Sequence, residues 1–163
     1  MVLWPLLLAA FTSGPVEVLV DNYRAAMLDS ENPLLVRKFD GVTASEVVFH
    51  TNLVQGTELP RGVPVAVVRL WDAEGEMVDL WHLRAGMHSA EWASARPDVE
   101  ARMAAVPNPW LSQVAPSGEF FARRYRASWR PSEPAVVTKI TVSRPKSLPP
   151  EVGLVLYRLE VRP

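Results

Sequence analysis

Several residue types and patterns are absent or scarce in this 163-residue chain, and each absence excludes a class of chemistry. Cysteine does not occur, which excludes disulfides, thiol nucleophiles and cysteine-ligated zinc or iron–sulfur centres. Charge of neither sign is in large excess, because 17 basic and 18 acidic residues give a net charge of -1. The chain as a whole therefore has no broad field to attract a phosphate backbone or an anionic bilayer, and we expect no nucleic acid partner.

The motifs that usually mark an enzyme are also missing. The sequence has no glycine-rich phosphate loop, Gly-x-Ser-x-Gly elbow, His-Glu-x-x-His pair or calcium loop of alternating acids. A metal cluster can be drawn from His82, His88 and Glu91, but their spacing matches no ligand signature. Glu91 and Asp98 could be drawn as a glycosidase pair, but acids this common always offer pairs. We predict no catalytic residue, no metal and no cofactor.

Only one long apolar run is present, at the start of the chain. Residues 2–11 are nearly continuously apolar, and small and polar residues follow them. A run of about ten residues fits the core of a signal peptide better than a membrane span, although no Lys or Arg precedes it and Pro5 interrupts it. We interpret residues 1–14 as a signal-peptide-like or membrane-anchor segment. The alternatives are the remnant of a final membrane helix of a larger protein, and a helix packed on a soluble core.

Residues 15–31 have a different apolar period. Spacings of three and four residues, which would line one face of a helix, relate five apolar or aromatic side chains: Val16, Leu19, Val20, Tyr23 and Met27. This spacing predicts an amphipathic helix or linker over 15–31. The competing interpretation is a strand over 16–20 that ends at the Asp21–Asn22 turn pair.

From residue 32 to 163 most segments have the two-residue alternation of strands, separated by Pro, Gly and Asn. VPVAVVRLWD and MVDLWHLRA flank residues 73–76, a connection of hairpin length that contains a glycine, and should pair antiparallel. In each of two later segments, alternate side chains are predicted to share one face of a strand. They are Val136, Thr138, Ile140 and Val142 in the first segment, and Val155, Tyr157, Leu159 and Val161 in the second. Sheets with one apolar face bury each other, so we predict a mainly β chain, an antiparallel β-sandwich of jelly-roll-like form. An N-terminal helical segment and one short helix near 97–106, beginning at Pro97, complete the prediction.

Six tryptophans are a further signal. Flat aromatic faces can stack on sugar rings while polar side chains bind the hydroxyls, but a Trp within an apolar strand, such as Trp71, more often packs in the core. The most concentrated set of polar and aromatic side chains lies in LRAGMHSAEWASARPDVE, Leu83 to Glu100. With the two residues just before it, this stretch supplies the candidate ligand-binding residues: Trp81, His82, His88, Glu91, Trp92, Arg96 and Asp98.

The same stretch resembles extracytoplasmic β-sandwich accessory domains of bacterial membrane proteins, including membrane glycosyltransferases. The resemblance rests on Leu83-Arg84-Ala85-Gly86, Ser89-Ala90-Glu91-Trp92-Ala93 and Arg96-Pro97-Asp98-Val99, about 20 residues in all. The pattern differs at His88, where an acid is expected, and at Ser94-Ala95, where an aromatic–acid pair is expected. The resemblance implies a domain facing the periplasm or the cell exterior and supplies no catalytic residue.

Taken together, the sequence predicts a non-catalytic extracytoplasmic accessory domain of a bacterial envelope system, periplasmic or extracellular and membrane-anchored if the N-terminal segment is retained. Its expected partner is a glycan or an envelope membrane protein, with membrane association through residues 2–11. One alternative is a structural subunit of a membrane protein assembly that docks through this segment, and another is a carbohydrate-active enzyme. The Leu83–Val99 stretch has two interpretations as well: a binding site, or a structural corner in which Arg96 pairs with Glu91 or Asp98.

Overall fold

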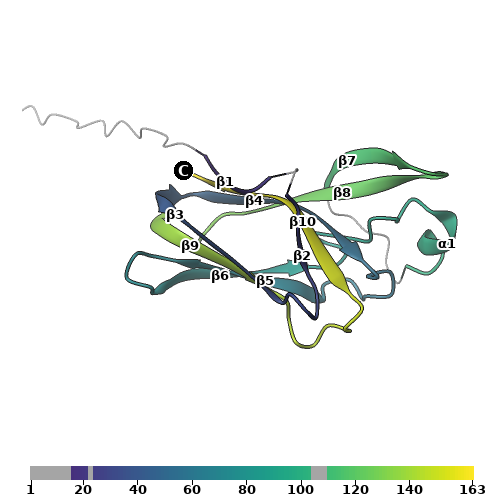
Figure 1. Cartoon of the computed structure of the whole chain (residues 1–163), viewed down its shortest axis with the longest axis horizontal. Helices are drawn as coiled ribbons and strands as arrows, with labels where there is room; N and C mark the ends of the chain where they lie inside the picture. Colours follow the sequence, from purple (N-terminus) through teal and green to yellow (C-terminus); the bar gives the residue numbers. More distant parts are fainter. Residues whose placement is uncertain (1–15, 22–23, 104–109) are drawn as a thin grey trace, which may run out of the picture.

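The computed structural model describes residues 16–21, 24–103 and 110–163, with the backbone alone for 110–115. Two antiparallel sheets face each other in this part of the chain, which confirms the predicted sandwich (Figure 1). The strands of sheet A are β1 (Glu17–Val20), β2 (Ala26–Leu28), β4 (Glu46–Val54), β7 (Trp110–Ser117), β8 (Phe120–Trp129) and β10 (Gly153–Arg162). Those of sheet B are β3 (Leu34–Ala44), β5 (Pro64–Trp71), β6 (Met77–Arg84) and β9 (Ala135–Ser143). Sheet A has the order β1-β10-β4-β8-β7, with β2 also paired to β10, and sheet B the order β3-β9-β5-β6.

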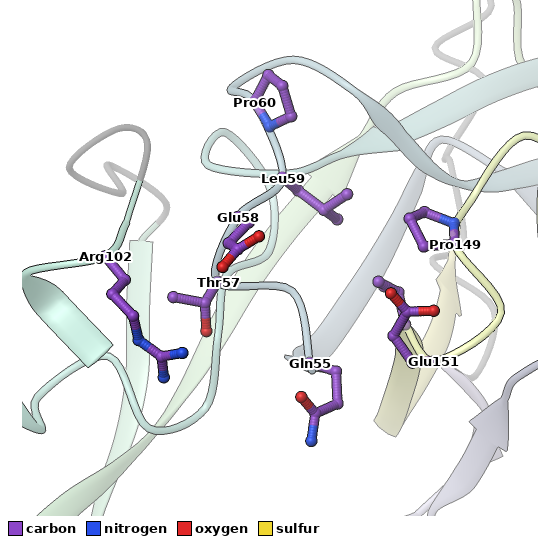
Figure 2. A pocket seen from close by; sticks show the side chains of 9 residues that line it. Gln55, Thr57, Glu58, Leu59, Pro60, Arg102, Pro149 and Glu151 are labelled. Atoms are coloured by element: carbon purple, nitrogen blue, oxygen red, sulfur yellow. The ribbon is translucent and has the colours of Figure 1, made fainter. Parts of the chain in front are cut away.

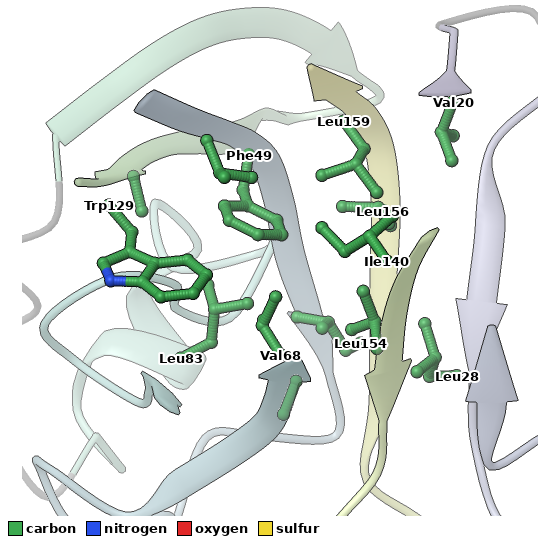
Figure 3. Packing of buried hydrophobic residues seen from close by; sticks show 14 of the residues in the cluster. Val20, Leu28, Phe49, Val68, Leu83, Trp129, Ile140, Leu154, Leu156 and Leu159 are labelled. Carbon is green, nitrogen blue, oxygen red and sulfur yellow. The ribbon is translucent and has the colours of Figure 1, made fainter. Parts of the chain in front are cut away.

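Apolar side chains of both sheets form one core between the layers. Figure 3 shows this cluster, with Trp129 at one end beside Phe49 and Leu83. Trp81 is stacked on Trp129, with ring centroids 5.9 Å apart and an interplanar angle of 8°, and its ring lies 5.7 Å from Phe49. A fully buried apolar side chain such as Phe49 contributes about 1.5–3 kcal/mol relative to an exposed one. Trp129 therefore belongs to the core, and the half-buried Trp81 packs against it.

The hairpin predicted around residues 73–76 is confirmed. β5 and β6 pair antiparallel, and Val68 lies opposite Trp81. The connection is closed by a hydrogen bond from the Asp72 N–H to the Glu76 carbonyl (3.1 Å) and contains Gly75 at φ 86°, a conformation that favours glycine. The short connection with its glycine and the apolar character of both strands were visible in the sequence.

The prediction of which side chains share the buried face is wrong in part for β9 and β10, the last two strands. Irregular pairing with the neighbouring strands explains part of the error. In β10 the side chains that belong to the core are Leu154 and Leu156 before Tyr157, and Leu159 and Val161 after it. Tyr157 is an extra residue relative to β4, and such a bulge exchanges the two faces of a strand.

In β9 the core position belongs to Val137, which is fully buried, and Val136 is 56% exposed. The register between β3 and β9 shifts close by, between the Lys38–Lys139 and Val42–Val137 pairs. A strict two-residue period cannot describe such a strand.

The helix predicted over 15–31 is wrong for the described residues, because they form β1 and β2, both paired to β10. The competing strand interpretation of residues 16–20 is confirmed. The helix predicted near 97–106 is present as α1 (Pro97–Glu100), which begins at the expected proline. The segment predicted over 1–14 lies outside the described residues. Within the described ranges no helix is long and apolar enough to cross a membrane.

Candidate functional site

A pocket of about 440 Å³ opens where three loops meet at one end of the sandwich. It is lined by Gln55, Thr57, Glu58, Leu59 and Pro60 of the β4–β5 loop, Pro149, Glu151 and Val152 of the β9–β10 loop, and Arg102, which follows α1. Figure 2 shows Arg102 on one side, Pro149 and Glu151 on the other, and Gln55 and Thr57 between them. Polar groups thus surround a space with a partly apolar wall.

A second hollow of about 130 Å³ adjoins this pocket. It shares three residues with the first pocket and reaches into the Leu83–Val99 stretch; its lining is Gln55, Thr57, Glu91, Trp92, Ala93, Arg96, Val99 and Arg102. We call the two hollows together the loop groove.

The shape of the β4–β5 loop is fixed where it leaves β4. Gln55 has φ 60°, in the left-handed region that costs a non-glycine residue about 1–3 kcal/mol. The next residue, Gly56, is buried, and a Cβ there would lie 2.8 Å from the Leu53 Cβ. The Gly56 N–H donates to Glu91 Oε2 at 2.8 Å. Strained backbone at a pocket wall persists only where neighbouring contacts hold it, and here Leu53 and Glu91 do so.

Glu91 holds the groove together from beneath. It is 4% exposed, and burial raises the pKa of its carboxyl, although N–H groups of Gly56 and Ala93 favour the charged form. A buried carboxyl that accepts a backbone N–H is an anchor between two loops. Its role in the loop groove is therefore structural support.

Residues 90–92 fill a gap in sheet A. The direct pairing of β4 with β8 ends at Thr51 and Tyr125. Beyond that point Leu53 donates to the Ala90 carbonyl (2.8 Å) and accepts from the Trp92 N–H (3.0 Å), and the Trp92 carbonyl accepts from Arg123 (2.9 Å). The segment thus lies between β4 and β8 and pairs with backbone N–H and carbonyl groups of these strands. The structural-corner interpretation of the stretch accounts for these backbone contacts.

The turn that leads into this segment is organised by Arg84 and His88. The Arg84 carbonyl accepts from the His88 N–H at 3.0 Å, and the Arg84 N–H donates to His88 Nδ1 at 3.0 Å. Burial and the nearby Arg84 charge lower the pKa of His88, which keeps Nδ1 free of a proton and able to accept. Gly86 has φ 68° and donates its N–H to the Ser89 carbonyl. The chain therefore turns at Gly86, directly after β6.

Buried hydroxyls behind the segment are paired. Ser89 accepts from Thr51 Oγ1 at 2.9 Å, and Ser94 Oγ lies 2.6 Å from the Tyr125 hydroxyl. Ser94 is 2% exposed. At Ser94, where the resemblance expects an aromatic residue, this chain thus has an internal hydrogen bond.

The structure brings some of the predicted site residues together and leaves others apart. Glu91, Trp92 and Arg96 line the second hollow, and Arg96 forms a two-pronged pair with Asp98 at 2.6 and 2.7 Å, which confirms one of the two predicted partners. The hydrogen bond from Arg96 lowers the pKa of the Asp98 carboxyl. Asp98 also accepts through its carbonyl from Arg102 at 3.2 Å, so α1 positions both guanidinium groups.

The remaining three predicted residues lie outside the loop groove. Trp81 is half-buried against the core, and the centroid of the His88 ring lies 4.7 Å from that of Trp81. His82 is half-buried on β6, opposite Val67. Across residues 16–21, 24–103 and 110–163 no three His, Asp or Glu side chains are placed to hold a metal ion.

The sequence did not predict five polar residues of the groove: Gln55, Thr57, Glu58, Arg102 and Glu151. The Pro- and Gly-containing loops at 55–63 and 144–152 were recognisable as turns. Their meeting at one end follows only from the strand order.

Comparison with protein-family models, curated proteins and solved structures gives no match to this chain.

Proposed function

We propose that this chain is a non-catalytic binding module of a bacterial envelope system, facing the periplasm or the cell exterior, and that the loop groove takes a glycan. The observation that carries the proposal is the lining of the groove. An amide, a hydroxyl, two carboxylates and a guanidinium surround a pocket of about 440 Å³ that also has prolines and aliphatic side chains in its wall. A sugar offers hydroxyls to such polar groups and C–H surfaces to such a wall.

Trp92 supports the same ligand class. Its side chain is half-buried and lines the second hollow, next to Arg96. Its ring lies 5.4 Å from Phe120, which restricts its orientation. An aromatic ring held in place beside a guanidinium suits stacking on a sugar ring with a hydrogen bond at the rim.

Jelly-roll connectivity belongs to this proposal. The run β2-β10-β4-β8 within six-stranded sheet A and the order β3-β9-β5-β6 of sheet B support it, because the chain passes repeatedly between these two sets of four strands. In such a sandwich, loops from different sheets gather at each end, and loops on a rigid scaffold are frequent binding sites.

The test is a glycan array with the whole 163-residue chain, followed by calorimetry with a glycan that binds. The whole chain is needed because β1 and β2 are paired to β10. Arg102→Gln removes a charged donor from the groove, and a lost hydrogen bond to a charged group is worth about 1.5–3 kcal/mol, so affinity should fall roughly 10- to 100-fold. Trp92→Ala should also weaken binding.

Arg130→Gln is the matched control, since Arg130 is exposed just after β8, at the end of that strand away from Phe120. Affinity should not change in this variant. Array binding that is absent, or equally weakened by Arg130→Gln and Arg102→Gln, would contradict the glycan role of the groove.

A carbohydrate-active enzyme is the second candidate, because Glu58 and Glu151 reach the same pocket from different loops. Hydrolysis needs two carboxyls about 5–9.5 Å apart. Release of new reducing ends from a bound oligosaccharide, abolished by Glu58→Gln or Glu151→Gln, would establish this candidate instead.

A further inference from the structure

The side of sheet A that faces away from the core carries a concentration of arginines. Residues that lie opposite each other on neighbouring strands share a face. Arg158 is opposite His50 and Arg162 is opposite Glu46, whereas the intervening Leu159 is in the core. The charged residues and the histidine of this outer face on β4, β8 and β10 are Glu46, His50, Arg124, Arg126, Arg158, Glu160 and Arg162; Arg124 precedes Arg126 by two positions on β8, and its guanidinium lies 3.7 Å from the centre of the Tyr157 ring. We call this set the arginine face.

On the arginine face Glu160 lies deeper than the guanidinium groups that it pairs with. Its side chain is 4% exposed and accepts from both Arg158 and Arg162, whose side chains are 37% and 38% exposed. Glu46, 21% exposed, pairs with Arg162 and with Arg126, which is 23% exposed. The face thus carries four guanidinium groups and two carboxylates, and its most exposed charges are those of Arg158 and Arg162.

His50 adds no charge to this face at neutral pH, because burial and the neighbouring arginines lower its pKa, outweighing the opposite effect of Glu160. The net charge of -1 for the whole chain therefore hides a local positive excess.

Exposed apolar side chains continue the arginine face toward the sheet edge. Val18 of β1 lies opposite Glu160 and Met27 of β2 lies opposite Val155, and each is 45% exposed. Both strands border β10. The sequence that leads into β1 contains the apolar run of residues 2–11. Guanidinium groups and apolar side chains are thus adjacent on one side of the sandwich.

We propose that the arginine face, together with Val18 and Met27, is the surface by which this chain lies against an anionic lipid bilayer. Guanidinium groups bind phosphate oxygens in a two-pronged way, and they give up their hydration more readily than ammonium groups. Val18 and Met27 enter the boundary between headgroups and acyl chains, as the apolar side of an interfacial segment does. The proposal does not depend on a ligand in the loop groove.

The test measures partitioning of the whole chain onto phosphatidylcholine vesicles with and without phosphatidylglycerol. Each arginine near an anionic surface contributes about fivefold to the partition coefficient at low salt. Arg124→Gln with Arg126→Gln should therefore lower partitioning onto the anionic vesicles by about fivefold per charge and leave partitioning onto the neutral vesicles unchanged. Val18→Ser with Met27→Ser should lower partitioning onto both kinds.

The control is Arg61→Gln with Lys146→Gln, which removes the same charge from exposed loop positions. Folding of all three double variants is checked by circular dichroism, so that loss of the arginine face is separated from loss of the fold. Equal losses in the control and the arginine variant, or no preference for phosphatidylglycerol, would overturn the proposal. Retention on heparin without partitioning onto anionic vesicles would also overturn it and would identify the face as a polyanion site.

Discussion

The close approach of Gly56 to Leu53 predicts a specific cost for Gly56→Ala. The new Cβ would lie 2.8 Å from the Leu53 Cβ and 3.0 Å from its Cδ1. Leu53 cannot retreat, because it is 1% exposed and both its N–H and its carbonyl are hydrogen-bonded to residues 90–92. Overpacking at such a site costs about 1–3 kcal/mol. The free energy of unfolding from urea titration should fall by that amount, and the melting temperature by about 2–4 °C per kcal/mol.

The same substitution should also disturb the loop groove, because Gly56 donates to Glu91 and adjoins Gln55 and Thr57. Gly75→Ala is a useful comparison: Gly75 has φ 86° and nothing within 4 Å of an added Cβ, so its cost is backbone strain alone. It should destabilise the protein without altering ligand binding. If Gly56→Ala changed the free energy of unfolding by less than about 0.5 kcal/mol, as a typical surface substitution does, the inference that Leu53 fixes this loop would be refuted.

Two further predictions concern buried polar groups near the groove. Because burial raises the pKa of Glu91, its ionised form penalises the folded state above the folded pKa, and the penalty disappears as pH falls through that pKa toward 4.5. Glu91→Gln should therefore be more favourable, relative to wild type, at pH 7.5 than near pH 4.5 in urea titrations; a pH-independent difference would contradict this. Tyr125→Phe leaves Ser94 without its 2.6 Å partner and should cost about 1–3 kcal/mol. In the double variant Tyr125→Phe with Ser94→Ala, the loss of unfolding free energy should be smaller than the sum of the losses in the two single variants. Strict additivity would show that the two hydroxyls do not interact.

The sequence predicted the sandwich because its strands mostly keep their period. β5 and β6 are apolar segments joined by a short turn that contains a glycine, so their pairing could be inferred from local pattern alone, whereas the register shifts at both ends of the pair could not. The extra residue at Tyr157 and the register shift near Val137 could not, because only the neighbouring strand shows where a bulge forms. β1 and β2 were mistaken for a helix because a bulged strand and a turn reproduced helical spacing.

The candidate site was predicted in part for a similar reason. Glu91, Trp92 and Arg96 are close in sequence, and the structure keeps them together. Thr57 and Glu151 are brought to one pocket by strands that cross between sheets, and nothing local in the sequence signals their approach. Trp81 was a candidate ligand-binding residue, and the structure stacks its ring on Trp129 against the core, because the sequence of a strand does not show which of its faces is covered.

The main chain and the side chain of Trp92 contact different parts of the molecule. Its main-chain atoms join β4 to β8, while its side chain lines the second hollow. The hydrogen bonds that join the two strands at this point therefore do not involve the Trp92 side chain. Specificity of the hollow could be altered at this single position, by selection or by engineering, with those main-chain hydrogen bonds left in place.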